Sequence, residues 1–238
     1  MRLPELSGVI LVTGTDTGVG KTVATAVLAA VATARGQDVV VCKPAQTGLA
    51  PGEPGDAAEA CRLSGLDAAR ARELARLPEP LAPTTAARRA GVRLRSTAEV
   101  AEQVAGLATE HDLVLVEGSG GVLVGLDGDG AGLLELADAL PGPGRFVVVA
   151  RAGLGSLNHT GLTCRAVRDR GHQVVLLVVG AVPEQPGLAE RCTLADLPEA
   201  AGTDQVVVLP EGLGADPARL HQTVRALLTP APTRPPKG

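Results

Sequence analysis

Aromatic side chains are nearly missing from this sequence, which has one Phe and neither Tyr nor Trp among its 238 residues. Proteins that bind single-stranded nucleic acid stack the bases on such side chains. The formal net charge of −4 likewise offers no basic surface for a phosphate backbone. We therefore expect no nucleic-acid partner.

Clustered cysteines and histidines are missing too. The four cysteines lie far apart with no Cys-x-x-Cys pair, and the four histidines show no metal-ligand spacing. The longest aliphatic run, residues 174–179, is too short to span a bilayer, and residues 1–8 lack the basic start and apolar core of a signal peptide. These absences predict reduced, mostly buried thiols in a cytoplasmic protein without a membrane segment.

No linker rich in Gly, Ser or charge divides the chain, so we expect a single domain over residues 1–228. The remaining segment, Thr229 to Gly238, is rich in proline, which cannot continue a helix or donate to a sheet ladder. We expect residues 229–238 to form a disordered tail.

Short β-branched runs alternate with longer stretches of Ala, Leu and Arg, the pattern of buried parallel strands covered by helices. The predicted strands are Val9–Thr13, Val39–Lys43, Leu113–Glu117, Phe146–Ala150, Val174–Val179 and Val206–Leu209. The predicted helices are Lys21–Arg35, Asp56–Leu63, Asp67–Arg76, Thr97–Glu110, Asn158–Arg170 and Pro217–Leu228, the fourth beginning at a capping box, Ser96 to Glu99. This pattern predicts an α/β fold with a doubly wound, mostly parallel sheet flanked by helices. Ligands bind such sheets at the carboxyl ends of the strands.

Lysine is scarce as well, since only Lys21, Lys43 and Lys237 occur among the 22 basic residues. Composition explains the scarcity but not the placement: Lys21 and Lys43 each follow a short apolar run. A compact ammonium with three rotatable donors is suited to reach between phosphate oxygens. The placement of these two lysines therefore indicates anion binding.

The segment Gly14 to Thr22, Gly-Thr-Asp-Thr-Gly-Val-Gly-Lys-Thr, follows a predicted strand and opens a predicted helix, as a phosphate-binding loop requires. Its glycines let backbone N–H groups face phosphate oxygens, Lys21 is expected to bridge the β- and γ-phosphates, and the Thr22 hydroxyl to bind magnesium. One departure is that Gly14 and Gly20 enclose five residues, whereas the common motif encloses four. The loop predicts a P-loop NTPase fold.

Two carboxylates are candidates for the same site. Glu117 ends a buried run and precedes Gly-Ser-Gly-Gly, where magnesium beside a phosphate loop needs a ligand. The alternative is an exposed carboxylate at a strand end. Asp56 is either a second such ligand or a plain helix N-cap, and the residues alone leave both open.

Lys43 ends another apolar strand and opens Lys-Pro-Ala-Gln-Thr-Gly. A charge there is costly without an anionic partner, so a phosphate or carboxylate partner is expected. Thr47 and Gly48 supply a hydroxyl and a turn beside it, or serve the turn only.

The segment Gly153 to His159 leads from a strand into a helix, whose first N–H groups can bind a carboxylate. Capping by Ser156 or Asn158 without a ligand is the alternative. His159 is expected to be a packed or solvated helix residue, because no acidic or nucleophilic partner accompanies it. With no covalent nucleophile visible, the chemistry is expected to be phosphoryl transfer by positioning and charge neutralisation.

Together, the phosphate loop, Lys43-Pro-Ala-Gln-Thr-Gly48, Glu117-Gly-Ser-Gly-Gly121 and Gly155-Ser-Leu-Asn-His159 resemble the dethiobiotin synthetase family over about residues 9–212. In that family the longer phosphate loop is normal. The resemblance implies a ligase of biotin synthesis that converts 7,8-diaminopelargonate, CO2 and Mg-ATP to dethiobiotin, ADP and phosphate. A substrate amine captures CO2 as a carbamate, the carbamate takes the γ-phosphoryl group, and the second amine displaces phosphate to close the ureido ring.

The resemblance also implies residue roles. The catalytic residues would be Lys43, Lys21 and Thr17, and the magnesium ligands would be Thr22, Asp56 and Glu117. Nucleotide would be bound by Gly18, Val19, Gly20, Lys21, Thr22, Val23, Asp56, Glu117, Gly118, Ser119, Gly120, Gly180, Ala181, Pro210, Glu211 and Gly212. Substrate would be bound by Thr47 and, from the neighbouring subunit of a homodimer, by Gly155, Ser156, Leu157 and Asn158.

One position departs from the family, which commonly has an adenine-reading Asn where this chain has Gly180. Without that amide, adenine loses a paired donor and acceptor. Our hypothesis is that the chain accepts several nucleoside triphosphates besides ATP.

Two other protein families share parts of this pattern. A partner-regulated ATPase of the MinD/ParA kind shares the fold, but that family usually carries an extra lysine early in its phosphate loop, where this chain has Gly14-Thr-Asp16. Its membrane-binding members end in an amphipathic basic helix, which the proline-rich tail cannot form. Cobyrinate amide synthases add a glutaminase domain, for which this chain has no room.

Overall fold

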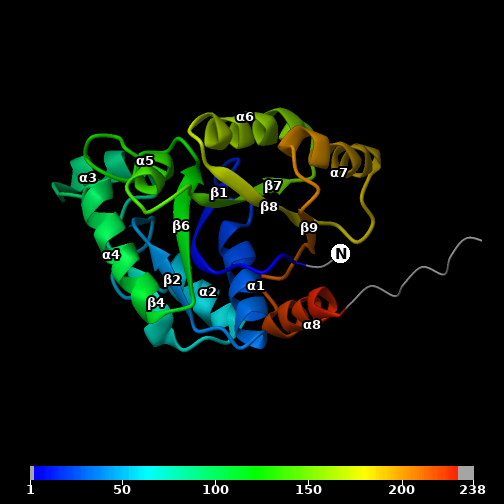
Figure 1. Cartoon of the computed structure of the whole chain (residues 1–238), viewed down its shortest axis with the longest axis horizontal. Coiled ribbons are helices and arrows are strands. Elements are labelled where there is room, and N and C mark those ends of the chain that lie inside the picture. Colours follow the sequence, from blue (N-terminus) through cyan, green and yellow to red (C-terminus); the bar gives the residue numbers. More distant parts are fainter. Residues whose placement is uncertain (1–2, 230–238) are drawn as a thin grey trace, which may run out of the picture.

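The central sheet has seven strands in the order β4-β2-β6-β1-β7-β8-β9, and every neighbouring pair is parallel (Figure 1). The structure is a computed structural model that describes residues 3–229. The strands of this sheet are β1 (Gly8–Gly14), β2 (Val39–Lys43), β4 (Ala71–Glu73), β6 (Leu113–Gly121), β7 (Arg145–Arg151), β8 (Gln173–Val182) and β9 (Val206–Pro210). The predicted doubly wound, mostly parallel fold class is confirmed.

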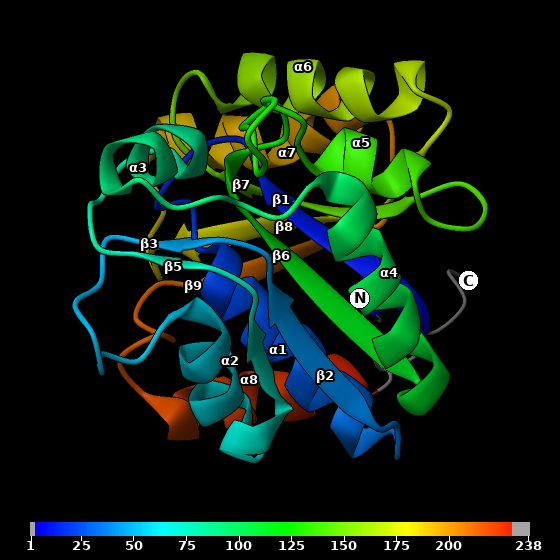
Figure 2. The same cartoon turned by 90° about the vertical axis from the view of Figure 1, so that its left-hand side faces the viewer.

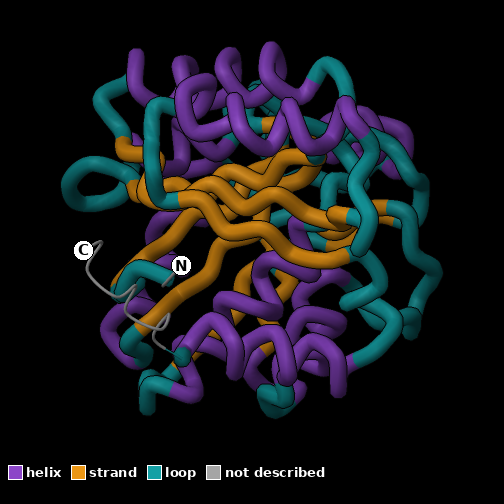
Figure 3. Tube along the Cα trace, turned by 90° about the vertical axis from the view of Figure 1, so that its right-hand side faces the viewer, coloured by secondary structure: helices purple, strands orange, loops and turns teal. Residues whose placement is uncertain are grey.

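Helices cover both faces of the sheet (Figure 3). One layer consists of α1 (Lys21–Ala34), α2 (Asp56–Ser64) and α8 (Pro217–Leu228). The other consists of α4 (Thr97–Glu110), α5 (Leu133–Asp138), α6 (Ser156–Asp169) and α7 (Leu188–Ala201). Outside the layers, α3 (Pro83–Ala90) packs beside a two-stranded sheet of β3 (Gln46–Thr47) and β5 (Arg76–Leu77), which Figure 2 places above α2.

The strands form because their residues are β-branched and buried on both faces. All five residues of β2, Val-Val-Val-Cys-Lys, are buried. Capping defines where helices start: Ser96 Oγ accepts from the N–H of Glu99 at 3.2 Å, and the Glu99 carboxylate accepts from the N–H of Ser96 at 2.7 Å. The predicted capping box of α4 is therefore confirmed.

The predicted helix Asp67–Arg76 is wrong. A single 3-10 turn, Ala68–Arg70, is followed by the edge strand β4, in which Ala71 pairs with Val41 of β2. The Ala, Arg, Glu and Leu residues of this segment favour a helix. The open edge of β2, however, offers hydrogen-bond partners to the backbone of the segment. The small helical preference is overridden by this tertiary contact.

Other elements differ in extent from the predictions or were not predicted. α6 begins at Ser156 rather than Asn158, β6 runs on through the glycines to Gly121, and β8 extends to Val182. The elements α3, α5, α7, β3 and β5 were not predicted, because they are short or carry no clear apolar periodicity.

Cys42, Cys61 and Cys164 are buried and reduced, and Cys192 is exposed and reduced, as predicted for mostly buried thiols. Burial raises the pKa of the Cys42 thiol to about 12, which makes it inert. No helix among the described residues is long and apolar enough to cross a membrane. The predicted tail lies outside the described residues, apart from Thr229, which is the C-cap of α8.

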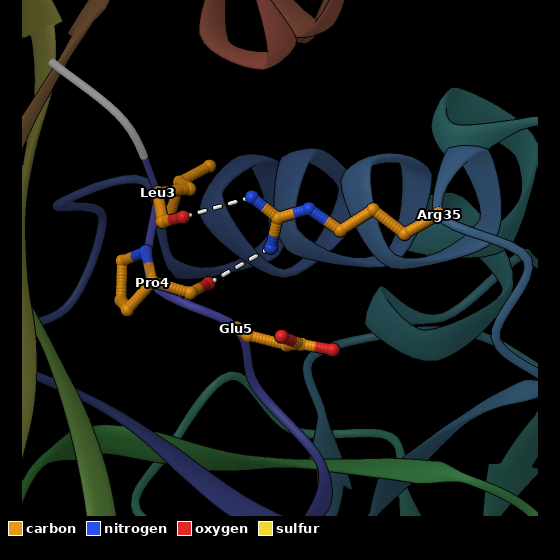
Figure 4. Close-up of a pocket in the computed structure, with 4 residues that line it drawn as sticks. All are labelled: Leu3, Pro4, Glu5 and Arg35. Carbon is orange, nitrogen blue, oxygen red and sulfur yellow. Dashed lines mark hydrogen bonds between the residues drawn. The ribbon is translucent and has the colours of Figure 1, made fainter.

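A hollow at the end of α1 is lined by Leu3, Pro4, Glu5 and Arg35 (Figure 4). The Arg35 guanidinium donates to the carbonyl of Pro4 at 2.9 Å and to that of Leu3 at 2.8 Å. Because α1 has 14 residues, this hollow lies about 20 Å from the phosphate loop at the other end of the helix. It therefore belongs to the anchoring of the N-terminal segment and not to the site described next.

Candidate active site

The phosphate loop joins β1 to α1 at the carboxyl edge of the sheet. Because β2, β6 and β1 are neighbours, their ends bring Lys43, Glu117 and the loop together. Gly18 and Gly20 have φ of 69° and 98°, in the left-handed region that favours glycine. Val19 between them is buried, so the loop is fixed to the body of the protein.

Lys21 lies at the start of α1 and is buried to 8 % exposure. Its ammonium donates to the carbonyl of Asp16 in the same loop at 3.0 Å. Burial lowers the pKa of Lys21, Glu117 opposes that effect, and the nearby Lys43 adds to it. The Asp16 carbonyl is neutral, so an anion that approached the loop would meet the charge of this ammonium.

Lys43 is the most enclosed charge of the site, with 3 % of its side chain exposed. Its ammonium contacts Asp56 Oδ2 at 2.7 Å, Glu117 Oε1 at 3.0 Å and the Gly118 carbonyl at 3.0 Å. Burial alone would lower the pKa of Lys43, but Glu117 and Asp56 outweigh it and raise the pKa. The anionic partner expected for Lys43 is thus a pair of carboxylates, and all three N–H donors are engaged.

Glu117 is 1 % exposed and accepts from three side chains. Besides Lys43, its carboxylate accepts from Thr22 Oγ1 at 3.1 Å and from Thr25 Oγ1 at 2.8 Å. The alternative of an exposed carboxylate at a strand end is therefore wrong. Thr25, which also donates to the Lys21 carbonyl at 2.9 Å, is a site residue that the sequence did not suggest.

Glu117 Oε1 accepts from the Thr22 hydroxyl and from the Lys43 ammonium, and the same ammonium contacts Asp56 Oδ2. Hard oxygen donors, including only one or two carboxylates, are the set that magnesium takes together with substrate phosphates. Within residues 3–229, no group of three or more His, Cys, Asp or Glu side chains is arranged so that it could hold a metal ion by itself. The donor set fits magnesium bound together with a nucleotide.

Asp56 is positioned by Gln46, whose Oε1 accepts from the Asp56 N–H at 2.8 Å and whose amide donates to the Thr47 carbonyl at 3.0 Å. The N-cap of α2 is Gly55, so the reading of Asp56 as a plain N-cap is wrong. Gln46 is buried and links the Lys43 loop to α2. Its polar but uncharged side chain gave no signal in the sequence.

The glycine-rich end of β6 lies against the phosphate loop. Thr17 Oγ1 is 3.3 Å from the place where a Cβ on Gly120 would stand, and Ser119 Oγ donates to the Ala45 carbonyl at 3.0 Å. A Cβ on Gly118 would stand 2.4 Å from Leu133. The structure therefore brings Thr17, Gly118, Ser119 and Gly120 together with Lys21 and Lys43.

Gly180 borders the phosphate loop on the opposite side from Lys43. A Cβ at this position would stand 2.7 Å from the Val19 carbonyl oxygen, closer than real contacts allow. Ala181 follows with a φ of 52°, in an irregular stretch of β8. The glycine at 180 thus lets β8 approach the loop.

The segment after β9 lies next to β8 and α1. The Glu211 N–H donates to the Val182 carbonyl at 2.9 Å, Pro210 is the register partner of Val182, and Gly212 has a φ of 83°. A Cβ on the nearby Gly214 would stand 3.2 Å from Val23. Pro210, Glu211 and Gly212 therefore border the α1 side of the site.

The predicted substrate residues divide into two places. Thr47 lies in β3, four residues after the last residue of β2. Gly155 is the N-cap of α6 with a φ of 86°, and no side chain caps the helix, so capping by Ser156 or Asn158 is wrong. Among residues 3–229, no hydrogen bond or ion pair joins residues 155–158 to Lys43 or the phosphate loop.

A parallel sheet with a glycine-rich, lysine-containing loop between its first strand and a helix defines a P-loop NTPase fold. The same fold occurs in a ParA family ATPase from Chlorobium tepidum (TM-score 0.54, 12% identity, 93% of this chain and 89% of that chain). It occurs also in the cell division ATPase MinD from Pyrococcus furiosus (TM-score 0.53, 18% identity, 93% and 89%). Such low identities support the shared fold alone.

A family model described as an AAA domain matches residues 9–211. The chain is 57% identical over 206 residues to the ATP-dependent dethiobiotin synthetase of Rhodococcus jostii, covering 87% of each chain. It is 54% identical over 223 residues to that of Saccharopolyspora erythraea, covering 94% of this chain and 96% of the relative. The chain belongs to the ATP-dependent dethiobiotin synthetase family, so the predicted resemblance and ligase-type enzyme are confirmed.

Proposed function

We propose that this chain closes the ureido ring of dethiobiotin from 7,8-diaminopelargonate, CO2 and ATP. Membership of the synthetase family supports the ATP-dependent step in biotin synthesis. The observation that carries the finer proposal is the Lys43 ammonium, which is held by two carboxylates at the end of β2 beside the phosphate loop. A second fixed cation at this place can neutralise an anionic co-substrate as well as the γ-phosphate.

In the proposed reaction, one substrate amine attacks CO2 and loses a proton to give a carbamate. A carbamate oxygen then attacks the γ-phosphorus, the bond to ADP breaks, and a carbamic-phosphoric anhydride forms. The second amine attacks the carbamoyl carbon, phosphate leaves, and the ring closes. Negative charge builds on the phosphoryl group and the carbamate, which is where fixed cations contribute most.

Lys21 and the loop N–H groups of Gly18, Val19 and Gly20 would hold the phosphates, and Thr17 would contact the transferred group. Lys43 would neutralise the carbamate and γ-phosphate; since its three donors are taken, it must first release a carboxylate oxygen or the Gly118 carbonyl. Magnesium would neutralise phosphate charge when held by Thr22, Asp56 and Glu117. Thr47 would meet the carbamate end of the substrate.

The start of α6, Gly155 to Asn158, would bind the substrate carboxylate for the neighbouring subunit of a homodimer. The N–H groups at a helix start favour an anion, and within residues 3–229 no hydrogen bond or ion pair joins this segment to Lys43. Leu154 is 87% exposed and Leu162 on α6 is 59% exposed. Large apolar side chains left in solvent support a protein contact on this face.

The test of the proposed function is phosphate release measured with and without diaminopelargonate and bicarbonate. We expect turnover to require both, with one dethiobiotin formed per phosphate released. ATP turnover that is indifferent to both additions would refute the proposal and favour a MinD/ParA-like ATPase.

For nucleotide choice, we expect kcat/KM for ATP to exceed that for CTP and GTP by less than about a hundredfold, because no side chain at position 180 pairs with the base. The measurement is kcat/KM for each triphosphate at saturating diamine and bicarbonate. Gly180→Asn should not restore adenine preference but should weaken binding of every nucleotide, since its Cβ would meet the Val19 carbonyl at 2.7 Å. Gly106→Ala, at an exposed position of α4 with open space around it, is the control. A Gly180→Asn variant that bound ATP alone more tightly would contradict this prediction.

A further inference from the structure

Arg151 is the last residue of β7, the strand on the far side of β1 from β6. Its Nη2 donates to the carbonyl of Thr17 in the phosphate loop at 3.1 Å. The same atom is 3.4 Å from the place of a Cβ on Gly18. The side chain is exposed, so this guanidinium lies on the solvent side of the phosphate loop.

Two further contacts fix Arg151 in this place. The Thr15 N–H donates to the Val149 carbonyl at 2.9 Å, which attaches the start of the loop to the end of β7. Arg151 is also the register partner of Gly180. Paired residues of parallel strands share a face, and because Gly180 has no side chain, the backbone of Val19 in the phosphate loop lies against this position of β8.

The cations of the site are therefore on two sides of the loop. Lys43 comes from β2 and contacts two carboxylates, whereas Arg151 comes from β7 and contacts a neutral carbonyl. A guanidinium has five N–H donors, and this carbonyl engages one of them. The others remain available to an anion bound at the loop.

Resting on the proposed function, we propose that Arg151 is a third cationic contact to the bound nucleoside triphosphate and binds oxygens of its terminal phosphate. Thr17, the loop residue that it touches, is the one proposed to contact the transferred phosphoryl group. A guanidinium one hydrogen bond from that residue is within reach of the same oxygens, and it matches their geometry with two parallel N–H groups. Arg151 thereby binds the phosphate chain and does not contact the base.

The test is nucleotide affinity measured by calorimetry with a non-hydrolysable triphosphate and with ADP, each with Mg2+. We expect Arg151→Ala to weaken triphosphate binding by roughly 10-fold to 100-fold, the value of hydrogen bonds to a charged group, and ADP binding much less. The loss of affinity should be equal for the adenine and the cytosine triphosphate. Arg151→Lys should recover part of the loss.

Arg151→Gln separates this role from a structural one, because its amide can still donate to the Thr17 carbonyl but carries no charge. We expect it to resemble Arg151→Ala. Triphosphate affinity at the wild-type level in Arg151→Gln, or equal losses for ADP and triphosphate, would assign Arg151 to positioning the loop and overturn the proposal. A loss confined to one base would overturn it too.

Arg145→Gln is the matched control. Arg145 begins the same strand and its Nη1 also donates to one carbonyl, that of Ser7, at 2.7 Å. The Arg145→Gln variant should bind nucleotides as tightly as the wild type does, and thermal melting should show that all variants are folded. If the wild-type protein binds triphosphate but does not close the ring, only the proposed function is refuted. If the Arg151 variants bind triphosphate as tightly as the wild type, only this inference is refuted. If the wild type binds no nucleotide at all, both are refuted.

Discussion

Replacing Lys43 by alanine is expected to lower kcat by roughly 10²-fold or more and to leave nucleotide binding largely intact, on the scale of removing one preorganised charge-stabilising donor. The lysine is 3% exposed and its ammonium is already held by Asp56, Glu117 and the Gly118 carbonyl. When the ammonium exchanges one of these partners for the developing charge, the other two still hold it in place. Removing Lys43 therefore raises the free energy of the transition state and leaves the affinity for nucleotide largely unchanged.

Arginine at position 43 should fail as well. The site surrounds a compact ammonium with three acceptors at 2.7–3.0 Å, and a planar guanidinium cannot replace it without moving a carboxylate. Kcat and KM come from phosphate release at saturating diamine and bicarbonate, nucleotide affinity from calorimetry, and folding from thermal melting. A Lys43→Ala enzyme with kcat within about tenfold of wild type would exclude the proposed role.

Lys21→Ala is the contrasting variant, because Lys21 belongs to the phosphate loop itself and donates to the Asp16 carbonyl at 3.0 Å. Its removal should weaken nucleotide binding in addition to kcat. Unchanged affinity in Lys21→Ala would contradict the role assigned to this lysine. Comparing the Lys21 and Lys43 variants therefore separates an effect on nucleotide affinity from an effect on stabilisation of the transferred phosphoryl group.

The parts of the fold that could be predicted are those whose local and global preferences agree. The runs that form β2 and β6 are β-branched and buried on both faces, so composition and environment favour the same structure. The segment from Asp67 to Arg76 has helical composition but lies at the open edge of β2, and no local pattern reports an edge. Its prediction failed for that reason.

The site divides in the same way. The phosphate loop and the need of Lys43 for an anionic partner are local features that the sequence carries. That the partners are Asp56 and Glu117, 13 and 74 residues away, follows only from the neighbouring positions of β2 and β6 and from Gln46 holding the start of α2. Arg151 was not predicted, because an arginine at a strand end has no sequence signature of its own.

The free energy of unfolding should depend most on Glu117. We expect Glu117→Ala to lower it by about 3–5 kcal/mol, measured by urea denaturation without nucleotide or magnesium. The variant leaves the Lys43 ammonium buried with one carboxylate, that of Asp56, which is 37% exposed. It also removes the acceptor of the Thr22 and Thr25 hydroxyls.

Asp56→Asn is the control for this prediction, since it removes the other carboxylate of the same ammonium from a half-exposed position, where water can replace part of the interaction. It should cost about 1 kcal/mol or less, as for exposed ion pairs. Both variants should lose divalent-cation binding in the presence of nucleotide if the two carboxylates hold the metal. Equal stability losses in the two variants would mean that burial of Glu117 is not what makes Lys43 depend on it. A loss confined to Glu117→Ala would identify this carboxylate as the main counter-charge of Lys43 in the free protein, and the same carboxylate would help to hold magnesium when nucleotide is bound.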